Sequence, residues 1–430
     1  MKSEESENVL SGAAGAQPGT VLSDDPAKWW RKSRFPLFIG SRALSLTGDM
    51  AATSALSIHV YQSTSSGLAV SGVFVARVLP RIFGALAGAI GDKVDLRQLL
   101  IWCDLVAGLV FVVIGLSAPG YLVLLGMLLV AESVATVASP ASETMVARTI
   151  PDHALARANG LVMAVEAIGF AAGSALGSLA AISWGYQYAL YVNASSFVLS
   201  ALLISVIPKV PPVVREDAEG SGFLSETLAG LRELRGDRQV MVVAVAMIGV
   251  TFGAALDRPA LVVLTQHNLG GSGVGYGLAL GGVSFGVLAA TVLMGRWRLL
   301  TPSATVLLIG VALEALGHLA MGLSPMVSWL VVAAFVGGFG NGVEAISGTT
   351  LLQRSSASGS IGLLMGVVMS GCYLADAIGS IVGGAIVGVT GARWSFVIAA
   401  ALMAGCAIVV GLSSRQPTSE RSGNSVESSI

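Results

Sequence analysis

Twelve long apolar runs, bounded by charged residues or by glycine, proline and serine, follow one another along most of this chain. An α-helix needs about 20 apolar residues to cross the hydrocarbon core of a lipid bilayer. The runs therefore predict an all-α membrane protein with twelve transmembrane helices. The predicted spans are 36–61, 68–91, 98–117, 120–145, 155–182, 187–207, 239–263, 274–295, 303–323, 327–350, 360–388 and 394–413.

The charge content argues against a soluble globular fold. Only 11% of the 430 residues are charged, whereas soluble domains contain about 25% charged residues. The net charge of −1 offers no basic surface to nucleic acid. The glycine-rich run Gly270–Gly277 lacks the Lys-Ser/Thr of a phosphate-binding loop, so no nucleotide site is predicted. The three cysteines have neither metal-ligand nor redox spacing, and we expect no metal or cofactor.

Lysine and arginine indicate the side of the membrane that each loop occupies, because cytoplasmic loops are enriched in them. With the N-terminus inside, 19 of the 24 lysines and arginines fall in cytoplasmic segments, and only Arg393 falls outside. The other four lie within spans. The sequence thus predicts a multi-pass protein of the cytoplasmic membrane with both termini in the cytoplasm.

The longest internal loop separates six spans from six. Apolar residues at roughly helical spacing between 223 and 234 fit either a short amphipathic helix on the inner membrane surface or a solvated linker. We expect a disordered cytoplasmic tail at 1–34, a six-helix bundle at 35–207, a cytoplasmic linker at 208–238, a second six-helix bundle at 239–413 and a disordered cytoplasmic tail at 414–430.

The two groups of spans are related by an internal repeat. A shift of 206 residues, without a gap, aligns seven identical residues, of which four are glycines at helix-packing positions or loops. Parallel repeats of this kind are a known transporter architecture, with the substrate path at their interface. The aligned pairs are Arg148 with Arg354, Gly160 with Gly366, Met163 with Met369, Gly173 with Gly379, Ser174 with Ser380, Gly177 with Gly383, and Gly185 with Gly391.

The short loop between the second and third spans carries a charged motif, Gly-Ala-Ile-Gly-Asp-Lys-Val-Asp-Leu-Arg, from Gly88 to Arg97. It resembles the G-x-x-x-D-[R/K]-x-[G/D]-x-[R/K] signature of the major facilitator superfamily. In that family reading Gly88 lets two helices touch, while Asp92, Lys93, Asp95 and Arg97 latch their cytoplasmic ends. The alternative is an ordinary charged turn. The resemblance implies two pseudo-symmetric six-helix bundles.

The resemblance covers about residues 34–412 and is closest to the branch of drug-efflux, macrolide-efflux and siderophore-export proteins. The stretch Ser45-Leu-Thr-Gly-Asp49 is similar to the Gly-Asp pair of that branch. Two features depart from it. The fifth span reads Gly-Ser-Ala-Leu-Gly from Gly173 to Gly177, where antiporters usually have Gly-Pro-x-x-Gly. The fourth span lacks the arginine of many drug–proton antiporters.

Several ionisable residues lie near the middle of the predicted spans. A charge at the bilayer centre costs about 2.5–3.5 kcal/mol on insertion scales, so such residues must face a watery cavity, pair with each other or stay neutral. Asp49, Glu132, Glu166 and Glu314 are predicted near the midplane, and Arg77 is their expected counter-ion in the first bundle. These five residues are candidates for proton coupling and for lining the substrate cavity, with structural ion pairs as the alternative.

The resemblance implies a secondary transporter rather than an enzyme. It would export a hydrophobic or amphiphilic, drug-like small molecule by alternating access, with protons as the coupling ion, and would act as a monomer. A siderophore or other metabolite exporter is the alternative within transport. A non-transporting membrane protein is a third reading, which no nucleophile–base spacing or metal cluster in the sequence supports.

Overall fold

The computed structural model describes residues 34–84, 94–210, 232, 234, 238–270, 273–296, 302–355 and 361–414. All regular elements within these ranges are helices, in agreement with the predicted all-α fold. In chain order they are α2 (Phe35–Thr64), α3 (Gly67–Val78), η1 (Leu79–Phe83), α5 (Leu96–Ser117), α6 (Tyr121–Thr149), α7 (Asp152–Ser183), α8 (Tyr186–Ser205), α10 (Arg238–Val263), η2 (Leu264–Asn268), α11 (Gly273–Arg296), α12 (Ala304–Gly322), α13 (Val327–Ser355), α14 (Ile361–Thr390) and α15 (Ala392–Ser414).

Ten segments of the described chain are helical and apolar enough, over a sufficient length, to cross a membrane. The other two predicted spans correspond to α2 and to α3 with η1. The second span differs from the continuous helix predicted over 68–91, because α3 ends at Val78 and a 3-10 turn follows. Pro80 accounts for this change, since proline lacks an N–H and its ring clashes with the preceding helical turn. Residues 85–93 lie outside the described part.

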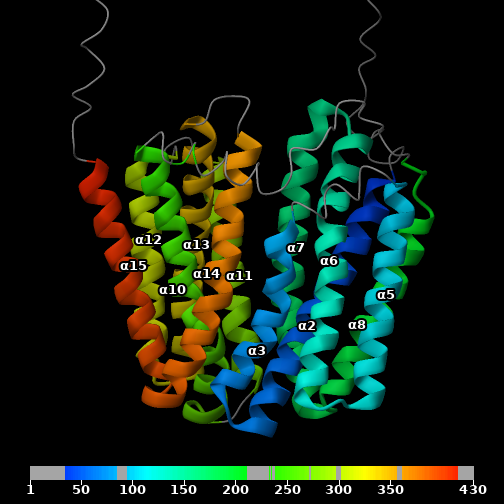
Figure 1. Cartoon of the computed structure of the whole chain (residues 1–430), viewed down its shortest axis with the longest axis horizontal. Helices are drawn as coiled ribbons and strands as arrows, with labels where there is room; N and C mark the ends of the chain where they lie inside the picture. The colour runs from blue at the N-terminus through cyan, green and yellow to red at the C-terminus, as the bar shows by residue number, and fades with distance from the viewer. Residues whose placement is uncertain are drawn as a thin grey trace, which may run out of the picture.

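The helices form two groups that follow chain order (Figure 1). In the first, α2 packs against α7 and α8, and α5 packs against α6 and α8. In the second, α10 packs against α14 and α15, while α13 packs against α11 and α12. The groups meet mainly through two pairs of helices, α7 with α11 and α3 with α14, and also where η1 contacts α14 and α3 contacts α10. In Figure 1, α3 and α14 come together in the lower part of the view.

The repeat seen in the sequence reappears in the packing of two helix pairs. A Cβ added at Gly177 of α7 would lie 2.1 Å from the backbone oxygen of Ala51 in α2, so only glycine fits this contact. In the second group, a Cβ at Gly383 of α14 would lie 2.2 Å from the backbone oxygen of Leu256 in α10. Close backbone approach at small residues is how membrane helices commonly pack. The two groups therefore use the same contact at matching positions.

The outward faces of the helices are apolar, as a lipid environment requires. Large side chains on several helices are exposed, where a soluble protein would rarely leave so many together. Examples are Trp102, Leu109, Leu116, Leu122 and Val332.

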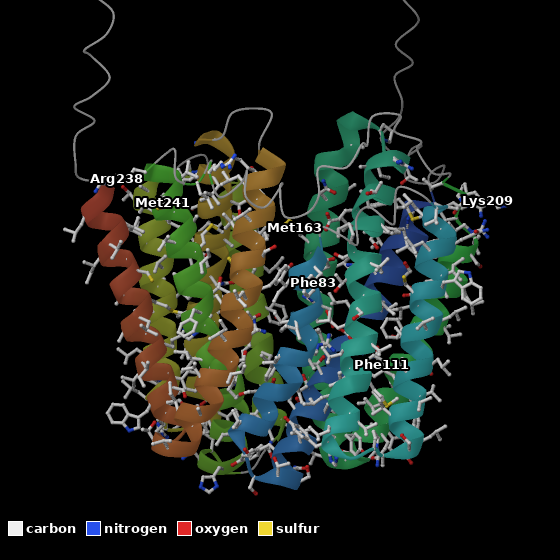
Figure 2. The ribbon with its side chains drawn as sticks, viewed as in Figure 1. Phe83, Phe111, Met163, Lys209, Arg238 and Met241 are labelled. Carbon is white, nitrogen blue, oxygen red and sulfur yellow. The ribbon has the colours of Figure 1, made fainter. Side chains whose placement is uncertain are left out.

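Basic residues mark one end of the helices. Lys209, just after α8, and Arg238, at the start of α10, lie at the same end in Figure 2. Arg34 belongs to that end as well, because it donates a hydrogen bond to the backbone carbonyl of Val206. This is the end that the lysine and arginine distribution predicts to be cytoplasmic.

Candidate functional site

A cavity of about 840 Å³ lies between the two groups of helices. It is lined by α2, α3, η1, α5, α6, α7 and α8 from the first group and by α11, α13 and α14 from the second. Its lining includes Arg42 and Met163, which lie in the first part of α2 and α7, and Gly366, near the start of α14. Met163 lies between the two groups in Figure 2. The cavity therefore extends toward the end of the helices that carries Lys209 and Arg238.

The opposite end is closed by direct contacts between the two groups. Ser71 of α3 donates a hydrogen bond to the backbone oxygen of Ser380 in α14 at 2.6 Å. A Cβ on Gly384 of α14 would lie 2.1 Å from Oγ of Ser71, and one on Gly277 of α11 would lie 2.7 Å from the backbone of α7 at Ser174. The structure is thus open on one side and shut on the other.

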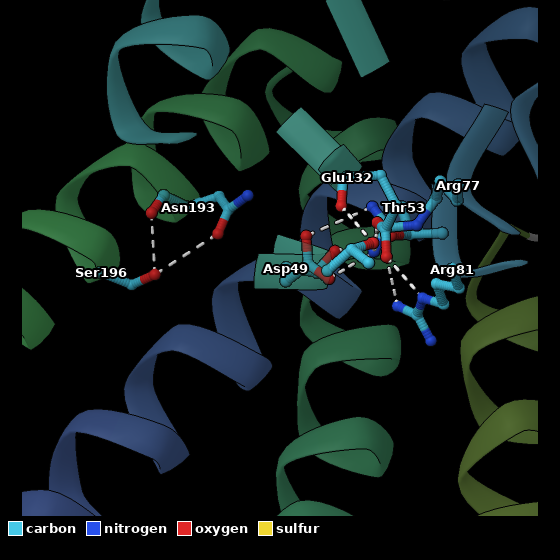
Figure 3. A network of polar contacts seen from close by, with 8 residues as sticks. Asp49, Thr53, Arg77, Arg81, Glu132, Asn193 and Ser196 are labelled. Atoms are coloured by element: carbon cyan, nitrogen blue, oxygen red, sulfur yellow. Dashed lines mark hydrogen bonds and ion pairs between the residues drawn. The ribbon is translucent and has the colours of Figure 1, made fainter. Parts of the chain in front are cut away.

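A chain of ion pairs crosses the first group of helices beside this cavity (Figure 3). Arg77 of α3 donates from both terminal nitrogens to the two carboxylate oxygens of Asp49 in α2. One of those nitrogens also lies 3.5 Å from Oε2 of Glu132 in α6. Arg81 of η1 contacts Oε1 of Glu132 through Nε at 2.6 Å and through a terminal nitrogen at 2.5 Å. Two guanidinium groups thereby balance two carboxylates.

These contacts place Arg77, which the sequence predicts as a counter-ion in the first bundle, beside Asp49 and Glu132. A buried charge is stable only when it is paired and hydrogen-bonded, and both Arg77 and Glu132 are buried. Glu166, another predicted residue, lies apart from this chain on α7 and pairs with Arg42 at 2.9 Å. Both members of that pair line the larger cavity.

A second, deeper cavity of about 400 Å³ shares Arg77, Arg81 and Tyr373 with the first and continues among the helices of the second group. Glu314 of α12, one of the candidates named from the sequence, lines it and is almost fully buried. Its Oε1 accepts a hydrogen bond from Nδ2 of Asn341 at 3.2 Å. Its Oε2 is buried with no hydrogen-bond partner among the described residues, and none of those residues forms an ion pair with it. His318, when protonated, acts on it electrostatically.

His318 lies one turn after Glu314 and connects α12 with α10. Its Nε2 is 3.0 Å from Oδ2 of Asp257, and its Nδ1 is 2.8 Å from the backbone oxygen of Glu314. The carbonyl can only accept, so Nδ1 carries a proton. Nε2 then faces a carboxylate oxygen, and the contact between them needs one further proton, on His318 or on Asp257. The pair is therefore a place where one proton is shared.

The residue after Asp257 faces a different partner. Nε of Arg258 lies 3.0 Å from Oδ1 of Asp376 in α14, and both residues line the deeper cavity. Pro259 follows directly inside α10, and a proline there removes one backbone hydrogen bond of the helix. Neighbours in a helix are about 100° apart, which lets Asp257 and Arg258 reach separate helices.

The sequence prediction missed His318, Asp257, Arg81 and Arg258 as parts of the site. The sequence contained one signal for His318, because Glu314 and His318 are four residues apart and so share a helix face.

Only part of the loop signature lies within the described residues. Asp95 caps α5 by accepting from the backbone N–H of Gln98 at 3.2 Å.

Arg97 of the loop signature donates to the backbone carbonyl of Ser205 and so joins the beginning of α5 to the end of α8. Gly88, Asp92 and Lys93 lie outside the described residues. Their proposed latch function stays a prediction.

The sequence profile of the Major Facilitator Superfamily matches residues 38–266 and 258–429. The multidrug efflux pump Tap of Mycobacterium tuberculosis (strain ATCC 25618 / H37Rv) is 27% identical over 397 residues, covering 87% of this chain and 92% of that protein. The putative bacilysin exporter BacE of Bacillus amyloliquefaciens is 24% identical over 272 residues, or 62% of this chain. That match spans just under two thirds of the exporter, 66% of its length.

Solved structures share the fold at low sequence identity. A mutant of the nucleoside transporter NupG superposes with a TM-score of 0.73 and 14% identity, covering 88% of this chain and 99% of the other. A bacterial homolog of the human lysosomal transporter Spinster, in an inward-facing and occupied conformation, gives a TM-score of 0.70 and 13% identity over 92% of this chain and 99% of the other.

Proposed function

The chain belongs to the Major Facilitator Superfamily and is a multi-pass membrane transporter of small molecules rather than an enzyme, and from this premise we propose that it exports an amphiphilic or hydrophobic compound from the cytoplasm. Relatives described as a multidrug efflux pump and as a putative bacilysin exporter support export as the direction. Both termini would lie in the cytoplasm, and the larger cavity would face it.

The observation that carries this proposal is the pair of connected cavities between two helix groups that, within the described residues, are held together by direct contacts at the end opposite the larger cavity. Transport by alternating access requires a central site that is open to one side at a time, with the two repeats rocking around it. The contacts of α3 with α14 and of α7 with α11 would open in the outward-facing state. The substrate would enter from the side of Arg42 and Met163.

Proton coupling is part of the proposal, and its site is assigned to the second group of helices. The Asp257–His318 contact shares one proton, and Glu314 next to it is buried with one carboxylate oxygen that has no hydrogen-bond partner among the described residues. Burying an unpaired charge is costly, so Glu314 would hold a proton in this state and release it when the site opens.

Asp49 is one of the five coupling candidates that the sequence offers, and the geometry supports a different role for it. Both of its carboxylate oxygens are bound by Arg77, so taking up a proton would break a buried ion pair. We propose that the series of ion pairs that connects Asp49, Arg77, Glu132 and Arg81 holds α2, α3, η1 and α6 together. Asp49→Asn tests that assignment directly.

The test uses purified protein in liposomes with an imposed pH gradient and a panel of anionic, neutral and cationic fluorescent amphiphiles. The wild-type protein should accumulate at least one compound against its gradient and move protons in exchange. Glu314→Gln should bind and equilibrate the compound but no longer accumulate it. Full pH-driven accumulation by Glu314→Gln, together with its loss in stable Asp49→Asn protein, would return coupling to Asp49. No gradient-dependent movement of any compound would contradict the transport mechanism.

A further inference from the structure

We propose that the deeper cavity selects amphiphilic organic anions, with Arg81 and Arg258 as a two-sided binding site for the anionic group. The two arginines come from opposite helix groups, and both line the same cavity of about 400 Å³. The inference rests on the proposed transport function and adds the charge class of the substrate. Carboxylates and other oxyanions share the chemistry that would be recognised.

The first support is the depth at which the charges of each sign lie. The Arg81 side chain is 44% exposed, whereas that of its partner Glu132 is 4% exposed. The Arg258 side chain is 42% exposed, and that of its partner Asp376 is 10% exposed. In both pairs the guanidinium lies in front of the carboxylate, on the side of the cavity.

The other charged groups around the deeper cavity are shielded. The side chain of Asp257 is 15% exposed and that of His318 is 9% exposed, and they face each other. Glu314 is 1% exposed, and the side chain of Arg77, at 9%, is bound to Asp49. Within the deeper cavity, the guanidinium groups of Arg81 and Arg258 are therefore more exposed than any carboxylate that lines it.

The second support is the number of donors left available. Arg81 uses Nε and one terminal nitrogen on the same oxygen of Glu132, and Figure 3 shows its third nitrogen pointing away from that carboxylate. Arg258 approaches Asp376 with Nε, and neither of its terminal nitrogens has a partner among the contacts of the described residues. A guanidinium presents paired N–H donors that match a carboxylate geometrically.

The rest of the cavity wall fits the apolar body of such a molecule. Phe74, Phe170, Tyr276 and Tyr373 all line the cavity. Small-molecule sites are mostly apolar, with a few polar groups that fix orientation. An anion held by arginines from both helix groups would also link the groups to each other, so that binding is coupled to their relative movement.

The first experiment measures the electrostatic potential of the cavity without knowledge of the substrate. Val283 is half-buried and lines both cavities, and Val283→Cys in a background free of native cysteines places a thiol there. Its rates of reaction with an anionic methanethiosulfonate (the ethylsulfonate) and a cationic one (the trimethylammonium ethyl reagent) are compared. Ser328→Cys, exposed at the start of α13, serves as the reference position. The anionic-to-cationic rate ratio should be about tenfold higher at Val283→Cys.

Removing both members of an ion pair then identifies which arginine produces the preference for the anionic reagent. The net charge of the protein does not change, so any change in the rate ratio reports the local arrangement of charges. Arg81→Gln with Glu132→Gln should lower the ratio at least threefold. Removing the pair of Arg42 and Glu166 in the same way should leave it within about twofold, because the two side chains are similarly exposed, at 30% and 37%.

The same rate comparison applies to Arg258→Gln with Asp376→Asn, which should also lower the ratio at least threefold. A ratio equal to that of Ser328→Cys, or one that favours the cationic reagent, would overturn the proposal. A decrease in the rate ratio that appears only when the Arg42–Glu166 pair is removed would overturn the proposal as well.

A binding experiment connects the potential to substrate class. N-acetyl-phenylalanine and its amide have nearly the same shape and differ in charge, and their binding to the protein in lipid nanodiscs can be followed by thermal unfolding. The carboxylate should bind at least tenfold more tightly, and the Arg81 and Arg258 pair variants should lose this difference. Equal binding of the two compounds, or binding of neither, would overturn the proposed anion site.

The outcome separates from that of the proposed function. Carboxylate selectivity without pH-driven transport in liposomes would leave the anion site standing and contradict proton-coupled export. Transport of the amide as fast as the carboxylate, driven by the pH gradient, would keep export and overturn anion selection.

Discussion

The two helix groups repeat each other in backbone packing and differ in their buried charges. Gly177 on α7 contacts α2 as Gly383 on α14 contacts α10. In the register of the repeat, however, Arg77 corresponds to Val283 and Glu132 to Gly338. The first group has a paired, charge-balanced set of side chains, whereas in the second Glu314 forms no ion pair among the described residues and one of its carboxylate oxygens has no hydrogen-bond partner there.

This difference indicates how one duplicated scaffold can hold two kinds of polar site. Close helix contacts depend on small residues at set positions, so both halves need them. The two halves share one central cavity, and one proton site is sufficient for coupling, so only one half needs to carry it. The four predictions below test whether the halves differ in this way.

The largest effect is expected for Arg77→Gln. It leaves Asp49 and Glu132 buried without their shared cation, and breaking a buried pair typically costs about 3–5 kcal/mol. Thermal unfolding in detergent should show severe destabilisation or loss of folded protein. Adding Asp49→Asn should recover part of it. Glu314→Gln should lower stability by less than about 1 kcal/mol, because amide and carboxyl are similar in size and no cation is left unpaired. Equal damage by Glu314→Gln would remove the contrast between the halves.

The second prediction concerns what the halves share. Gly177→Ala and Gly383→Ala each force a Cβ to within 2.2 Å of a backbone oxygen, and overpacking of this kind costs about 1–3 kcal/mol or more. Both variants should unfold at lower temperature by similar amounts. Gly160→Ala and Gly366→Ala are matched controls on the same helices, since a Cβ at either position meets no atom within 4 Å. Destabilisation by only one of the two packing variants would show that the repeat is not used equally.

The third prediction compares removal of a charge pair in each half. Asp257→Asn with His318→Gln removes the shared proton but leaves no unpaired charge, so the protein should fold and lose pH-driven accumulation by at least about tenfold, equivalent to 1.4 kcal/mol. Asp49→Asn with Arg77→Gln should retain accumulation. The readout is uphill transport in liposomes, with downhill exchange as the control for folding. Loss of accumulation in Asp49→Asn with Arg77→Gln, but not in Asp257→Asn with His318→Gln, would move the coupling site to the first group of helices.

The sequence could predict the helices, the repeat and the Arg77 counter-ion, because each depends on patterns along the chain. It could not predict that Arg81 faces Glu132 or that His318 faces Asp257. These helices are apolar on most faces, so periodicity does not reveal their rotation, and pairing across helices depends on that rotation. The same limit explains why the sequence does not separate Asp49 from Glu314 as a coupling candidate. Depth in a span can be read from the sequence, whereas the presence of a partner cannot.

The smallest effect is expected at the closed end, where the repeat is again imperfect. Ser71 corresponds to Gly277, and Ser178 corresponds to Gly384. The inter-group contacts therefore pair a serine with a glycine in both places, with the residues exchanged. Only the first contact has a hydrogen bond from its serine across the groups, since Ser71 donates to Ser380 while Ser178 donates to Ser174 in its own helix.

Ser71→Ala should therefore favour opening of this end more than Ser178→Ala does. A net hydrogen bond contributes about 0.5–1.5 kcal/mol, which corresponds to a change of roughly two- to twelvefold in the ratio of open to closed protein. Spin labels at Ser65 and Thr390, both exposed at this end, would report the two populations by electron–electron double resonance. Ser178→Ala has the same change in composition and should leave the ratio unchanged, because its lost bond lies within α7. Equal shifts by both variants would mean that side-chain packing, and not the bond across the groups, holds the end closed.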